Sequence, residues 1–169
     1  DEIRRCPQSF AALDRVDPRL ASSEEVASRP CGKRKTMTRQ MVETSDPKDV
    51  VQCFYAEAIN GRDLDAVDCR LTDDFRHNGE LRGRPGQRAA IAAFLDGFSD
   101  LHHEILIILA EGEFVSAYQR WTGTHDGPFL GSAPSGRFVS FTSTAILRVR
   151  GGQIAEAWDV VDIALSAQL

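Results

Sequence analysis

Two tight-turn signals in the second half of the chain constrain the fold most strongly. Glu111-Gly112 and Gly151-Gly152 each separate two runs that are rich in β-branched and aromatic residues. Glycine-containing turns between such runs predict β-hairpins, because glycine adopts the backbone geometry of tight hairpin turns. The predicted strands cover residues 103–110, 114–124, 138–149 and 154–162. The second half of the chain is therefore predicted to form an antiparallel meander.

Three segments with the sequence features of helices precede these strands. Asp46 can cap a helix with Pro47 at its first position, and Asn60-Gly61 can end it. A second short helix is predicted over residues 63–70, and a third begins at Pro85. The third helix has one apolar face at spacings i, i+3, i+4 and i+7, formed by Ile91, Phe94, Leu95 and Phe98. Helices followed by a meander predict an α+β domain in which three N-terminal helices pack on a curved antiparallel sheet.

The chain divides by composition near residue 45. Residues 1–45 mix charged residues, serine and proline with scattered apolar residues, which predicts a flexible N-terminal extension. Its basic run Lys33-Arg34-Lys35 is interpreted as a solvated linker rather than a nucleic-acid tail. We expect natural translation to start at Met37 or Met41. Residues 46–169 form the predicted folded domain.

Charge and composition argue against several classes of function. The 20 Lys and Arg residues against 25 Asp and Glu give a net charge of −5, which disfavours nucleic-acid binding. The longest apolar run, Ile105–Ala110, is too short to cross a membrane. Adjacent His102 and His103 would point to opposite faces of a strand, so they cannot share a metal ion. Nucleotide-binding glycine motifs and CxxC pairs are absent. We therefore expect a cytoplasmic protein without metal, organic cofactor, nucleic-acid or membrane partner.

The last predicted strand carries the strongest candidate for acid/base chemistry. Period-two alternation puts Asp159 on one face with Ala155, Ala157 and Val161. A carboxylate in a partly dry apolar hollow is disfavoured as an anion, a property that suits a general base or acid. When only the alternation is considered, an aspartate at such a position more often has a structural role, in which it pairs with an arginine or accepts hydrogen bonds from backbone N–H groups, than a catalytic one.

Four further side chains could face the same hollow. The alternation that contains Val115 and Ala117 also contains Gln119 and Trp121, and His125 follows at the predicted mouth of the hollow. A lone loop histidine is more often a hydrogen-bonded structural residue than a proton shuttle, and Trp121 is more often core than ligand platform. His77, in the sequence FRHNG, could face a pocket or satisfy the end of a strand.

Three stretches of sequence resemble one known family. THDGPFLGSAPSGRFVSF and LRVRGGQIAEAWDVVD are similar to the loop and the closing motif of the SnoaL-like polyketide cyclases, within the nuclear-transport-factor-2-like (NTF2-like) superfamily. DDFRHNGELRG is similar to a weaker family pattern. The resemblance covers roughly residues 48–169. It implies a cone-shaped α+β fold that encloses a mostly apolar cavity, and self-association through the open face of the sheet.

The resemblance also implies roles for individual residues. Asp159 matches the acid/base aspartate of the cyclases, and His125 and His77 match histidines at or near the cavity. We therefore expect Asp159 and His125 to be catalytic, and the substrate-binding set to be His77, Gln119, Trp121 and Phe129. One position departs from the family: several cyclases have a histidine near Ala145, where this chain has none.

These observations predict an enzyme of polyketide-type secondary metabolism such as antibiotic biosynthesis. The expected reaction is a cofactor-independent intramolecular aldol cyclisation of an aromatic polyketide or ester precursor, with Asp159 as acid/base. A hydroxylase-type relative that deprotonates a quinone-like substrate before it reacts with oxygen is the first alternative. A non-catalytic small-molecule binding or dimerisation domain is the second, because fold alone does not choose among these functions.

The expected partners are a small apolar or aromatic substrate and a second copy of the chain. Alternation places Ile154, Trp158 and Val160 on the face of the last strand opposite Asp159, which favours a homodimer through the outer sheet face. The alternative is that residues 1–47 or a turn around Leu165–Leu169 fold back over this face.

Overall fold

The structure is a computed structural model that describes residues 46–161. All of them belong to one compact unit, Glu43–Leu169. The predictions for the N-terminal extension and for the turn around Leu165–Leu169 concern residues outside the described range. Within that range, no helix combines the length and the apolar character that a membrane span requires. The expected cytoplasmic location stays a prediction.

The first predicted helix is present over its whole length. α1 covers Pro47–Phe54, and a π-helix continues it without a break over Tyr55–Asn60. The carboxylate of Asp46 accepts the backbone N–H of Lys48 at 2.9 Å and caps the helix, as the sequence predicts. A π-helical turn is wider than an α-helical one and is often found at functional sites.

The two other helices also match their predictions. α2 covers Asp65–Arg70, and α3 covers Gly83–Gly97, beginning two residues before the predicted start at Pro85. The apolar face of α3 packs inward, with buried side chains at Ile91, Leu95 and, just after the helix, Phe98.

The sheet has six strands among the described residues, in the order β2-β1-β6-β5-β4-β3. The strands are β1 Leu71–His77, β2 Glu80–Leu81, β3 His102–Glu111, β4 Phe114–Thr124, β5 Phe138–Arg150 and β6 Gln153–Val161. The predicted antiparallel meander is confirmed as β3 to β6. β1, however, pairs with β6 in parallel, so the sheet is mixed rather than wholly antiparallel. This pairing arises because α3 carries the chain to the far edge of the sheet, and the meander then returns β6 alongside β1.

A β-bulge changes which residues of β6 face inward. Arg148 pairs with Glu156, but Val149 pairs with Ile154, so Ala155 is an extra residue in the ladder. The side chain of Ile154 is fully buried on the same face as Asp159. The prediction that Ile154 lies on the outer face was therefore wrong, because uniform alternation cannot anticipate a bulge.

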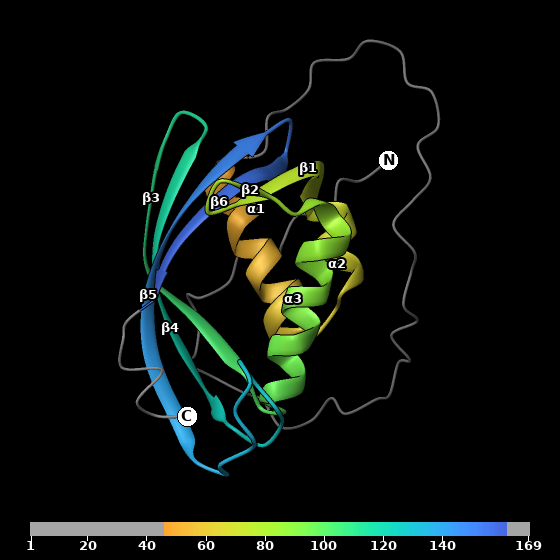
Figure 1. The fold of residues 1–169 in the computed structure, drawn as a ribbon. Helices are drawn as coiled ribbons and strands as arrows, with labels where there is room; N and C mark the ends of the chain where they lie inside the picture. The colour runs from red at the N-terminus through yellow and green to blue at the C-terminus, as the bar shows by residue number, and fades with distance from the viewer. Residues whose placement is uncertain (1–45, 162–169) are drawn as a thin grey trace, which may run out of the picture. The chain divides into compact units, whose positions relative to one another are not determined.

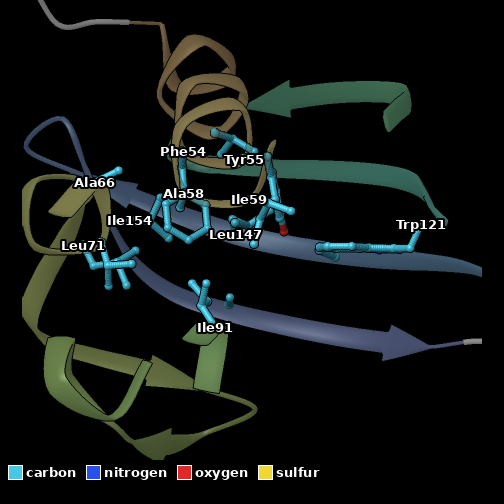
Figure 2. Packing of buried hydrophobic residues seen from close by; sticks show 14 of the residues in the cluster. Phe54, Tyr55, Ala58, Ile59, Ala66, Leu71, Ile91, Trp121, Leu147 and Ile154 are labelled. Atoms are coloured by element: carbon cyan, nitrogen blue, oxygen red, sulfur yellow. The ribbon is translucent and has the colours of Figure 1, made fainter. Parts of the chain in front are cut away.

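The core lies between the helices and the inner face of the sheet. Figure 1 shows the curved sheet with α1 and α3 on the same side of it. Apolar side chains from both layers fill this space near α1, including Ala58, Leu147 and Ile154 (Figure 2).

Candidate active site

An apolar cavity of about 510 Å³ lies between the helices and the sheet. Its wall is mostly aromatic and aliphatic, and its polar or charged lining residues are His77, Arg82, Gln87, Ser143, Asp159 and the hydroxyl-bearing Tyr55. A largely apolar hollow with a few polar groups is typical of a site for a small organic molecule.

The strand order brings two of the predicted site residues together. β6 lies between β1 and β5, so Asp159 has neighbours from both strands. His77, the last residue of β1, pairs with Ala157 in the parallel ladder. Asp159 lies two residues beyond Ala157 and therefore on the same face as His77.

His77 and Asp159 form a hydrogen-bonded histidine–carboxylate pair. Nε2 of His77 lies 2.8 Å from Oδ2 of Asp159, and both residues line the cavity. The backbone N–H of Asp159 donates to the side-chain oxygen of Asn78 at 2.9 Å. Asn78 and Gly79 form the two-residue turn after β1, with positive φ angles of 50° and 85° that suit asparagine and glycine. The turn thus fixes both partners of the pair.

Among the described residues, no donor binds Oδ1 of Asp159. The side chain of Asp159 is 29% exposed and that of His77 is 15% exposed. His77 thus holds one of the two carboxylate oxygens of Asp159, and Asp159 lines the cavity.

Ala145 lies directly opposite Asp159 in the antiparallel ladder between β5 and β6. The missing histidine noted in the sequence would therefore stand beside the carboxylate. In this chain the histidine partner of Asp159 comes instead from β1, on the other side of β6.

Two of the residues that are predicted to bind substrate, Trp121 and Phe129, also line the cavity. Nε1 of Trp121 donates to the hydroxyl of Ser143 at 2.9 Å, which fixes the indole. The ring of Phe129 stacks on Phe94, with centroids 5.0 Å apart. Flat aromatic walls of this kind favour flat aromatic ligands.

His125 does not line the cavity, in contrast to its predicted place at the mouth of the hollow. Its ring is fully buried beside Phe98, and Nδ1 lies 3.1 Å from the hydroxyl of Ser135. Its backbone N–H and C=O bond to Arg137 and Gly136. His125 thus holds the loop between β4 and β5 in place, and its catalytic role stays a prediction without a contact to the cavity.

Gln119 is buried behind the cavity wall rather than in it. It bonds to Tyr55 and His103, two residues that the sequence did not single out as functional. Tyr55 lies on the apolar face of the first helix, where a tyrosine is typically a core residue. The local sequence therefore does not indicate a functional role for it. Within residues 46–161, no group of three or more His, Cys, Asp or Glu side chains is arranged to hold a metal ion.

A curved sheet, helices that close over an apolar cavity and a histidine–carboxylate pair on its wall together define an α+β domain built around a cavity. The sequence matches the profile of the SnoaL-like polyketide cyclases over residues 49–169. The chain belongs to this family, and its fold is the predicted NTF2-like fold.

Several solved structures are similar to this chain. IdmH from Streptomyces antibioticus, a candidate polyketide cyclase, is 26% identical with a TM-score of 0.65, over 73% of this chain and 98% of its own. TsrD from Streptomyces laurentii is 29% identical with a TM-score of 0.64, over 70% and 93%. AclR from Streptomyces galilaeus, a candidate hydroxylase, is 26% identical with a TM-score of 0.63, over 71% and 77%. No curated protein sequence matches the chain.

Proposed function

We propose that this protein is a polyketide cyclase that closes a ring by intramolecular aldol condensation, with Asp159 as acid/base. The observation that carries the proposal is the His77–Asp159 pair, 2.8 Å apart on the wall of a 510 Å³ apolar cavity. A cavity filled by side chains would have favoured a purely structural or dimerisation module. The family and the similarity to IdmH support the same class of reaction.

The reaction needs one proton acceptor and correct positioning. Asp159 removes a proton from a carbon between two carbonyl groups, and the enolate carbon attacks a carbonyl of the same molecule. A carbon–carbon bond forms, and Asp159 returns the proton to the new alkoxide. The step requires no oxidant and no cofactor, and effective molarity within the cavity supplies much of the rate.

His77 orients the carboxylate in this scheme. Its Nε2–H donates to Oδ2 and leaves Oδ1 facing the substrate carbon. We predict that His77→Phe, which keeps an aromatic ring but removes the hydrogen bond, lowers turnover about 10- to 100-fold. The measurement is solvent deuterium incorporation into a 1,3-dicarbonyl compound, followed by NMR. His102→Phe, an exposed position on β3, is the matched control and should match the wild type. Equal rates for all three proteins would remove His77 from the scheme.

A hydroxylase is the second candidate function, because AclR is similar in sequence and fold over most of this chain. In that reaction the same Asp159 would deprotonate a quinone-like substrate that then reacts with oxygen. An oxygen electrode separates the two functions. A cyclase forms its product equally fast under argon and air, whereas a hydroxylase consumes oxygen with its product.

We also propose a homodimer through the outer face of the sheet. Apolar side chains on neighbouring strands meet there, as the ladder pairs Ile146 with Trp158 and Ile107 with Tyr118. Val160 is 74% exposed, Ile107 56% and Ile146 46%. We call these five residues the outer patch. A patch of this kind exposed to water is typical of an interface, and two-fold pairing would bury it on both copies.

Charged substitutions in the outer patch test the dimer. Trp158→Glu and Ile146→Glu should each give monomers by light scattering, because an unpaired carboxylate is costly to bury in an apolar interface. Leu81→Glu, at an exposed apolar position on β2, should leave the dimer intact. A wild-type monomer at micromolar concentration would contradict the proposal.

A further inference from the structure

A buried chain of three polar side chains runs from β3 across β4 to the first helix. Nε2 of His103 lies 3.0 Å from Oε1 of Gln119, and the side-chain amide of Gln119 donates to the hydroxyl oxygen of Tyr55 at 3.2 Å. The exposed fractions of His103, Gln119 and Tyr55 are 3%, 0% and 7%. The proposed proton transfer by Asp159 makes no use of this chain.

The two hydrogen bonds between His103, Gln119 and Tyr55 both run in one direction, with the donor on the His103 side. Burial lowers the pKa of His103 to about 4, so its ring is neutral near pH 7 and carries one N–H. The amide oxygen of Gln119 can only accept, so Nε2 of His103 is the donor. The amide nitrogen of Gln119 can only donate, so the oxygen of Tyr55 is the acceptor. The hydroxyl hydrogen of Tyr55 therefore takes part in neither of these two hydrogen bonds.

The surroundings of Tyr55 hold its ring against the cavity. The ring stacks on His103 with centroids 4.2 Å apart and meets the edge of Trp121 at 6.0 Å. Figure 2 shows the ring reaching from the helix toward the sheet, with its oxygen in red. Tyr55 lines the cavity, and among the described residues no acceptor is bonded to its hydroxyl hydrogen.

Tyr55 remains protonated under working conditions. Burial raises the pKa of its hydroxyl, and the negative charge of Asp159 raises it further. Tyr55 and Asp159 both line the cavity. A neutral phenol and a carboxylate at one apolar cavity are suited to different tasks, since the first donates a hydrogen bond and the second accepts a proton.

We propose that Tyr55 donates its hydroxyl hydrogen to a carbonyl oxygen of the substrate and stabilises the enolate oxygen that forms when Asp159 removes the neighbouring proton. A fixed donor aimed at the oxygen where charge develops stabilises the transition state more than the ground state. Gln119 and His103 are positioning residues that keep the hydroxyl turned toward the cavity. The inference rests on the proposed function, and it requires a substrate with an oxygen acceptor beside its acidic C–H.

Ligand binding tests the donor without any turnover. The probes are 1-tetralone, labelled with ¹³C at its carbonyl, and tetralin, which lacks only the oxygen. On binding to the wild type, the carbonyl stretch of 1-tetralone should move to lower wavenumber in the infrared spectrum. Tyr55→Phe should abolish this shift and weaken 1-tetralone binding about tenfold, while tetralin binding is unchanged. Thr122→Val removes a hydroxyl on the outer face of β4, outside the outer patch, and should behave as the wild type.

Gln119→Leu separates positioning from chemistry. It keeps the phenol but removes its anchor, so the carbonyl band should lose most of its shift while tetralin still binds. Asp159→Asn should retain the full shift, because the hydroxyl of Tyr55 is unchanged in this variant. If the wild type shows the shift but has no turnover, only the proposed reaction is contradicted. An unchanged band in Tyr55→Phe, or no binding of 1-tetralone to the wild type, would overturn the role of Tyr55.

Discussion

Replacement of Asp159 by asparagine is expected to lower turnover by about two to four orders of magnitude. The substitution keeps the volume of the side chain and can still accept a hydrogen bond from His77, but it cannot accept the substrate proton. Thermal stability should change little, because Asp159 is partly exposed and its neighbours keep their packing. The measurements are the steady-state rate on a polyketide ester with an acidified C–H and a thermal melt of each protein.

Comparison with His125→Ala identifies the proton acceptor. His125 is fully buried in the loop between β4 and β5. Its loss should therefore lower the melting temperature and have only a small effect on the rate of the chemical step. If Asp159→Asn is fully active and His125→Ala is folded but inactive, the proposed assignment of the acid/base is wrong. If both variants are active, neither residue carries the proton.

Gly127→Ala is expected to cause the largest loss of stability. A Cβ at this position would overlap the carbonyl oxygen of Asp96 and come within 3.2 Å of the Cα of Gly97. Because these are backbone atoms at the end of α3, no side chain can rotate to relieve the overlap. We expect a loss of about 2 to 4 kcal/mol in the free energy of unfolding, measured by urea denaturation.

The same substitution should also disturb the cavity. The backbone N–H of Gly127 donates to the carbonyl of Gly97 at 3.1 Å, and this contact sets the position of Phe129 two residues later on the cavity wall. Gly86→Ala in α3 is the matched control, since its nearest neighbour would be a side-chain carbon at 3.4 Å. It should be neutral or slightly stabilising. A Gly127→Ala protein as stable as Gly86→Ala would show that the loop can move away from α3 without cost.

The loop motif that carries the family resemblance also anchors the loop between β4 and β5 to the end of α3. Asp126 accepts hydrogen bonds from the backbone and hydroxyl of Ser99, which hold the pKa of its carboxyl below the usual range. His125, Asp126 and Gly127 thus fasten one loop to the segment after α3. The family motif predicts a catalytic role for His125, and that role stays a prediction; in this structure its ring is fully buried and Nδ1 lies 3.1 Å from the hydroxyl of Ser135.

The sequence by itself determined the helices, the four strands of the meander and most of their inward faces. Capping at Asp46, helical spacing in α3 and the glycine turns at Gly112 and Gly151 are local signals, and each element formed where its signal lay. Alternation along β4 also predicted the inward faces of Gln119 and Trp121, because the side-chain period of a strand is a property of the backbone alone.

Only the tertiary structure decided which of these residues meet. The parallel pairing of β1 with β6 brings His77 to Asp159 across 82 positions of sequence, and nothing local to either residue encodes that pairing. The bulge at Ala155 turns Ile154 inward, and the packing of the helix on the sheet joins Tyr55 to Gln119. Such contacts depend on the order of strands and on the way the layers pack, which are collective properties of the whole domain.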